Sequence, residues 1–144
     1  MIGGQVLDIL GENNGSLTLD DLKRLQSLKT GALIRAAARL GCLAAGKDAE
    51  SPEAVAADRY AEGIGLAFQI VDDVLDVVGD ASLLGKQTGV DSKKHKITFM
   101  NFYSPEEAMA HARRLTDEAA DAISGYEGAE TLRTLAYYLL ERNY

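Results

Sequence analysis

The stretch from Tyr60 to Asp80 reads YAEGIGLAFQIVDDVLDVVGD, and it indicates the kind of fold that the chain adopts. If each residue turns by about 100° about a helix axis, the apolar side chains fall on one wide arc, which predicts a helix that is almost entirely buried. The opposite arc, the acidic arc, holds no lysine or arginine. Its members are Glu62, Gly65, Gln69, Asp72, Asp73, Asp76 and Asp80, with Asp58 in the same line just upstream.

Three aspartates are grouped most closely on the acidic arc. Asp72 and Asp76 lie one helical turn apart, about 6 Å between side-chain origins, and Asp73 flanks them. Two carboxylates at that distance repel by about 3 kcal/mol at an effective dielectric constant near 20, so in a partly enclosed groove they require a cation. The alternative is a solvated stripe, because like charges on an exposed helix cost only a few tenths of a kcal/mol. Solvated faces usually mix both signs of charge, however, which favours a metal site.

The ligand type indicates which metal this site would hold. Carboxylate oxygens without Cys or His beside them select a hard cation, Mg²⁺ before Zn²⁺. Mg²⁺ bound by one or two carboxylates usually completes its shell with water and substrate phosphates. The sequence therefore predicts Mg²⁺ as the cofactor and a phosphorylated ligand. A calcium-binding EF-hand does not fit, because its spacing of oxygen ligands around a central glycine is absent.

The bulk composition limits the classes of protein to consider. A chain of 144 residues suits one domain. Its formal charge of −7 argues against a nucleic-acid partner. The single cysteine, Cys42, cannot form an internal disulfide and is interpreted as a small core residue. Because no run approaches the roughly 20 apolar residues of a membrane span, and the first residues lack an export signal, we expect a cytoplasmic protein.

The first residues have the pattern of a helix that is ending. Apolar residues recur at helical spacing over residues 1–10, with no capping residue in front. The pair Gly3 and Gly4 would weaken a helix, so we expect another part of the chain to pack closely there. Residues 11–16, GENNGS, are expected to form a turn.

A second helix is expected to begin after Thr18, with Asp21 at the reciprocal position of a capping box. Leucines and alanines continue its apolar face to Leu43. Gly31 interrupts this pattern and predicts a kink or a free carbonyl beside it. Two arginines of this helix are interpreted as surface charges: Arg35 and Arg39.

Ser51 and Pro52 are expected to start the central helix, which would run to about Val78. Residues 79–103 are expected to be irregular, and their length indicates a segment that is either functional or disordered. Ser104 then opens a helix with an S-x-x-E capping box, and a last helix is expected to end at Arg142. With no alternating strand pattern, the chain is predicted to be all-α, an antiparallel helix bundle.

Five stretches of the chain, taken in order, resemble motifs of the trans-isoprenyl diphosphate synthase family, which makes farnesyl and geranylgeranyl diphosphate. They are GGQVLD (3–8), KTGALI (29–34), FQIVDDVLDVVGD (68–80), LGKQTGVD (84–91) and HKITF (95–99), and the closing LLERNY (139–144) resembles bacterial short-chain members. The resemblance covers essentially residues 1–144 but only the carboxyl-terminal half of the family pattern, because the first aspartate-rich motif, expected before GGQxxD, is absent. It implies a partial isoprenoid synthase fold.

The resemblance also implies roles for individual residues. Lys29, Lys86 and Lys96 would contact the allylic diphosphate, and Lys96 is preferred over its lysine neighbours only because it precedes ITF. Thr30 and Gln69 would border the reacting carbon. Asp72 and Asp76 would be metal ligands, with Asp73 as their supporting acid. Asp91 would belong to the surroundings of this second aspartate-rich motif. Gln5 and Asp8 would line the active site.

The implied activity is that of a prenyltransferase. An allylic diphosphate would ionise with the help of Mg²⁺, and isopentenyl diphosphate would attack the resulting carbocation. In the family, Mg²⁺ would be held between two aspartate-rich motifs. Because the first of these motifs is absent, the 144 residues alone are expected not to turn over. The alternative is a non-catalytic helical subunit that modulates a complete synthase. The apolar arc of the central helix is expected to be covered by self-association in a homo-oligomer or by a missing amino-terminal portion.

Overall fold

The computed structural model describes residues 2–6, 17–83 and 97–142, without the side chains of residues 79–83. All regular structure in these ranges is helical, so the all-α prediction is confirmed. Residues 2–6 are helical as expected, whereas the predicted turn at residues 11–16 lies outside the described part of the chain. The other elements are α2 (Leu19–Gln26), the π-helical turn η1 (Ser27–Gly31), α3 (Ala32–Ala44), α4 (Pro52–Leu83), the 3-10 turn η2 (Phe99–Asn101), α5 (Pro105–Ala122) and α6 (Ala129–Glu141).

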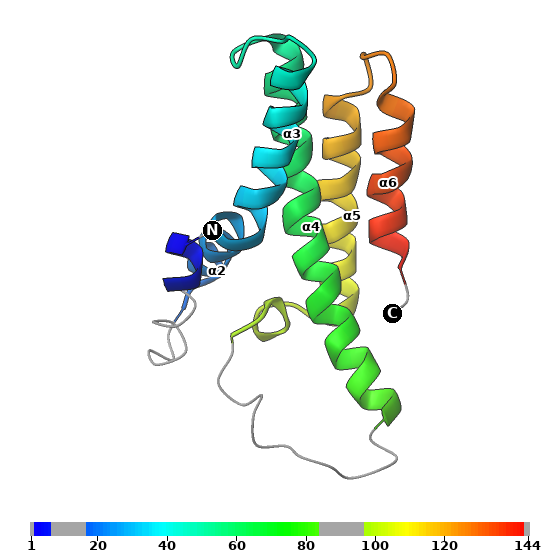
Figure 1. Cartoon of the computed structure of the whole chain (residues 1–144). Helices are drawn as coiled ribbons and strands as arrows, with labels where there is room; N and C mark the ends of the chain where they lie inside the picture. The colour runs from blue at the N-terminus through cyan, green and yellow to red at the C-terminus, as the bar shows by residue number, and fades with distance from the viewer. Residues whose placement is uncertain (1, 7–16, 84–96, 143–144) are drawn as a thin grey trace.

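The long helix α4 runs through the middle of an antiparallel bundle (Figure 1). Helix α3 packs along one side of it, and α5 and α6 pack along the other. From α3 onward, successive helices run in opposite directions, as the short connections after α3 and α5 require. Each of the other described helices from α2 onward therefore contacts α4.

Side-chain caps fix the predicted helix starts. Thr18 Oγ1 accepts a hydrogen bond from the Asp21 amide at 3.2 Å, and Asp21 Oδ2 accepts one from the Thr18 amide at 3.1 Å. Ser104 forms the same reciprocal pair with Glu107 in front of α5. Both capping boxes satisfy amide groups that have no partner inside the helix, which confirms these two starts.

The end of α4 differs from the prediction. The helix continues to Leu83 rather than ending near Val78, so Gly79 lies inside it. A single glycine weakens a helix interior by about 1 kcal/mol, which does not terminate a helix that is otherwise well supported. Residues 79–83 are therefore helical rather than irregular, and residues 84–96 lie outside the described part of the chain.

The core lies where α4 meets η2 and α5. Ile70 and Val71 on α4 are completely or almost completely buried, and Phe99 of η2 is packed into the same cluster. Small residues bring α4 and α5 together: a Cβ atom on Gly63 would lie 2.9 Å from the Cβ of Ala119. The prediction of a buried arc on α4 is thus confirmed over its middle part.

The apolar arc of α4 is not buried along its whole length. Val77 and Val78 are 47% and 53% exposed, because this end of α4 projects beyond the other helices (Figure 1). The larger open apolar surface is on α3, where Leu33 and Leu40 are 62% and 65% exposed. Among the described helices, none is sufficiently long and apolar to cross a membrane.

Candidate active site

The π-helical turn η1 carries two of the predicted site residues, Lys29 and Thr30. It separates α2 from α3 and ends at Gly31, so the predicted interruption at this glycine is confirmed. A π-helical turn widens the backbone ring by one residue, and such turns occur frequently at functional sites. Both site residues are half-buried here.

Two glycines allow other helices to approach η1 at backbone distance. A Cβ atom on Gly4 would collide with the backbone of η1, at 2.6 Å from the carbonyl carbon of Leu28 and 2.7 Å from the Cα of Lys29. On α4, a Cβ atom on Gly65 would lie 3.4 Å from the Cα of Gly31. The predicted close packing is therefore confirmed at Gly4, but it is wrong at Gly3, where a Cβ atom would meet nothing within 4 Å.

The contact at Gly65 places η1 at one end of a row of polar residues on α4. Gln69 and Asp73 follow Gly65 at intervals of four residues, so the three positions share one face of the helix. Gln69 and Asp73 are half-buried. The turn that carries Lys29 and Thr30 therefore packs against α4 near the face that bears Gln69 and Asp73. Of the other implied lining residues, Gln5 is exposed beside Gly4 and Asp8 lies outside the described residues.

Asp73 on α4 holds the first residue of the η2 turn. Its Oδ2 accepts a hydrogen bond from the backbone amide of Phe99 at 2.8 Å. Phe99 is the last residue of the HKITF stretch, so the described end of that motif is tied to the aspartate-rich motif. The predicted site residues Lys86 and Lys96, together with Asp91, lie outside the described residues.

The acidic arc is not free of positive charge, which corrects the prediction. Arg142 Nη2 donates to Asp72 Oδ1 at 2.8 Å, and Arg35 reaches two other members, Asp58 and Glu62. Arg35 belongs to α3 and Arg142 follows the end of α6, so a pattern within α4 could not reveal them. Asp76 remains an exposed carboxylate.

Arg35 is more than the surface charge that the sequence indicated. Its Nε and Nη2 atoms donate to the two carboxylate oxygens of Asp58 at 3.0 and 2.6 Å, a two-pronged pair between α3 and α4. Its Nη1 lies 3.7 Å from Glu62 Oε1. The interpretation of Arg35 as a surface charge was wrong, because its partner Asp58 lies opposite it across the contact between α3 and α4 and is only 17% exposed. Arg39 stays largely exposed, 3.7 Å from Asp58.

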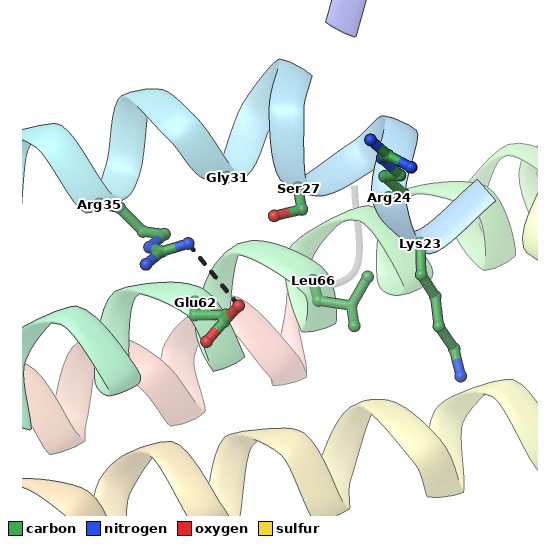
Figure 2. A pocket seen from close by; sticks show the side chains of 7 residues that line it. All are labelled: Lys23, Arg24, Ser27, Gly31, Arg35, Glu62 and Leu66. Carbon is green, nitrogen blue, oxygen red and sulfur yellow. Dashed lines mark ion pairs between the residues drawn. The ribbon is translucent and has the colours of Figure 1, made fainter. Parts of the chain in front are cut away.

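A small cavity lies beside η1 in the groove between α2, α3 and α4 (Figure 2). The ion pair between Arg35 and Glu62 crosses one end of it, while Lys23 points away along the groove toward α5. Its volume is about 230 Å³. The residues that line it are Lys23, Arg24, Ser27, Gly31, Arg35, Glu62 and Leu66.

The sequence pattern of the polyprenyl synthetase family matches residues 1–133. The chain belongs to the polyprenyl synthetase family. The resemblance inferred from five short motifs is thereby confirmed.

Individual relatives of this polyprenyl synthetase chain are similar over its full length. It is 45% identical to the farnesyl diphosphate synthase of Escherichia coli over 147 residues, which cover 99% of this chain and 48% of the relative. It is 39% identical to the geranylgeranyl diphosphate synthase of Cyanophora paradoxa, covering 99% and 47% of the two chains. The crystal structure of an FPP/GFPP synthase from Zymomonas mobilis matches with a TM-score of 0.80 at 33% identity, covering 96% of this chain and 45% of that one. The chain thus spans about half the length of these relatives.

The carboxylates of this polyprenyl synthetase chain fit Mg²⁺ in their donor chemistry. Asp72 and Asp76 are exposed oxygen donors, one turn apart on α4. Over residues 2–6, 17–83 and 97–142, no three Asp, Glu, His or Cys side chains gather closely enough to hold a metal ion by themselves. That arrangement suits Mg²⁺, which is usually bound by one or two carboxylates and completed by water and substrate phosphates.

The pair between Arg35 and Asp58 predicts how acid affects stability. The hydrogen bonds from Arg35 hold the pKa of Asp58 below its ordinary value of 3.8. Stability from this pair is therefore present above pH 3.8 and is lost as the pH falls through the lowered pKa of the folded state. Asp58→Asn is expected to lower the free energy of unfolding by about 1 kcal/mol at pH 7, and this deficit should shrink as the pH falls below 3.8 and the carboxylate of the parent chain is protonated.

Urea unfolding of both proteins between pH 2.5 and 7 measures this difference. Asp121→Asn, which changes an exposed aspartate of α5, is the matched control and should show almost no deficit at either end of the range. A deficit for Asp58→Asn that stays constant down to pH 2.5 would contradict the expected linkage.

Proposed function

We propose that this chain is the carboxyl-terminal part of a prenyl diphosphate synthase. In the proposed reaction of the whole protein, an allylic diphosphate loses its diphosphate group, and isopentenyl diphosphate attacks the resulting carbocation. Family membership and the names of the relatives support this class of reaction. The observation that supports the proposal for this chain is the contact of η1 with Gly65, because the turn that carries Lys29 and Thr30 packs against the helix that bears Gln69 and Asp73.

The proposed roles follow from the chemistry of each side chain. Lys29 supplies a positive charge for the diphosphate, together with Lys86 and Lys96. Thr30 and Gln69 present neutral oxygen dipoles toward the reacting carbon, where positive charge develops.

Acidic residues of α4 complete the proposed site. Asp72 and Asp76 are the proposed ligands of Mg²⁺, which when bound supplies Lewis-acid stabilisation of the negative charge on the departing diphosphate. Asp73 holds the η2 turn next to these ligands by accepting a hydrogen bond from the Phe99 amide.

Metal binding tests the proposed site. Mn²⁺, which can be followed by electron paramagnetic resonance, is expected to bind the 144-residue chain, and Asp72→Asn should weaken that binding at least tenfold because it removes a charged oxygen ligand. Glu127→Gln is the matched control: it removes one negative charge from an exposed side chain between α5 and α6 and should leave the affinity unchanged. Equal affinities of Asp72→Asn and the parent chain would refute the proposed role of Asp72.

We also propose that these 144 residues alone do not turn over, since they correspond to about half of each relative. Incubation with Mg²⁺, an allylic diphosphate and labelled isopentenyl diphosphate should give no more product than a reaction without protein. Steady product formation would contradict this proposal. An altered rate of a complete synthase when this chain is added would instead favour the helical-subunit function.

A further inference from the structure

Arg142 lies where the chain leaves α6, and its side chain turns back onto α4. The helix ends at Glu141, and Arg142 has an extended backbone, with φ −62° and ψ 144°. Its Nη2 donates both to Asp72 Oδ1 at 2.8 Å and to the carbonyl oxygen of Phe68 at 3.1 Å. The guanidinium carbon lies 3.8 Å from the centre of the Phe68 ring. Three separate contacts therefore fix this side chain.

The burial of Arg142 is unusual for a residue so close to the end of the sequence. Its side chain is only 10% exposed, whereas the Asp72 side chain that it contacts is 55% exposed. Its Nε atom is buried without a hydrogen-bond partner, although leaving a buried donor unpaired is unfavourable. The arginine is thus enclosed against Phe68, while its partner carboxylate remains open to ions from solution.

A divalent cation on Asp72 and the guanidinium of Arg142 would compete for the same negative charge. Both are positive, and each is stabilised by the same carboxylate at short range, so binding of the ion must either displace Arg142 or proceed against its repulsion. Because such coupling is reciprocal, occupation of Asp72 by the ion also weakens the attachment of the chain end to α4.

We propose that Arg142 is a positioning residue for Asp72: it holds the carboxylate in the ion-free protein, lowers the affinity of Asp72 for divalent cations and is released when an ion binds. The inference rests on the proposed function, in which Asp72 is a metal ligand. Arg142 is part of the closing LLERNY, but the family resemblance assigned it no function. The contact between Arg142 and Asp72 should therefore differ between the ion-free and the ion-bound protein.

Mn²⁺ titrations of charge-altering variants test the competition. Arg142→Met keeps an apolar stem against Phe68 but removes the charge, and it is expected to bind Mn²⁺ about tenfold more tightly than the parent chain. Arg142→Lys keeps the charge and should remain within about threefold of the parent. The matched control is Arg113→Met, which removes an exposed arginine of α5 that lies 3.8 Å from Glu141 of α6, and it should leave the affinity unchanged. Equal or weaker binding by Arg142→Met would overturn the inference.

A second measurement follows the side chain itself. The Nε–H proton of Arg142 is shielded from solvent, so it should give a slowly exchanging signal in a ¹H–¹⁵N spectrum, identified by its loss in Arg142→Lys. Addition of Mg²⁺ is expected to shift this signal or remove it through faster exchange, and Asp72→Asn should abolish the response. A signal that stays unchanged while Mg²⁺ binds through Asp72 would overturn the inference and leave the proposed function intact. If no variant shows binding that depends on Asp72, the proposed function fails, and the inference fails with it.

Discussion

Replacement of Phe99 by alanine is expected to lower the free energy of unfolding by about 3–5 kcal/mol. The Phe99 side chain has no exposed surface, and it packs in the central cluster with Leu22, Ile70 and Val71. Its removal loses the transfer free energy of a whole aromatic ring and leaves a cavity that rigid helices can fill only partly. Urea unfolding followed by circular dichroism at pH 7 measures the loss.

Phe102 provides the matched control for this change. It lies three residues further along the same turn, but its side chain is 36% exposed. Phe102→Ala should therefore cost less than about 1.5 kcal/mol, because more than a third of the residue's surface already contacts water and less apolar area is returned to solvent. Similar losses for the two variants would contradict the placement of Phe99 in the core.

Replacement of Gly63 by alanine is expected to destabilise the protein by about 2 kcal/mol, even though alanine favours helices over glycine by about 1 kcal/mol. The added Cβ would lie 2.9 Å from the Cβ of Ala119 and 3.1 Å from the carbonyl oxygen of Leu115. Neither group is the end of a flexible side chain, so α4 and α5 would have to move apart. Thermal and urea unfolding measure the change.

Gly41 on α3 offers a control in which the same substitution should have the opposite sign. A Cβ atom on Gly41 would meet nothing within 4 Å. Gly41→Ala is therefore expected to stabilise the protein by about 0.5–1 kcal/mol, because only the lower helix propensity of glycine is removed. Stabilisation by Gly63→Ala as well would show that α4 and α5 are not in close contact at that position.

The parts of the fold that were predicted from the sequence depend on residues near one another in the chain. The capping pairs at Thr18 and Ser104 join residues three positions apart, and the interruption at Gly31 follows from one residue type inside a helical pattern. Local geometry decides such features, so a sequence contains enough information to place them.

The neighbours of the acidic arc could not be predicted in this way. Arg142 and Asp72 are 70 residues apart, and Arg35 and Asp58 are 23 residues apart. Which arginine meets which aspartate depends on the order and tilt of the helices, and the periodicity of a single helix does not contain that information. The extended backbone of Arg142 also had no sequence signal, because neither of the two residues that follow it is a glycine or a proline.

The π-helical turn has a consequence for changes in chain length. It contains one residue more than an α-helical turn would need, so deletion of a single residue between Ser27 and Gly31 would let α2 and α3 join as one unbroken α-helix. Everything before the deletion would then be rotated by about 100° relative to α3, and Leu22 and Leu25, both buried now, would leave the core. Residues 45–50 are all exposed and connect the antiparallel helices α3 and α4, so a length change there would leave both register and core intact.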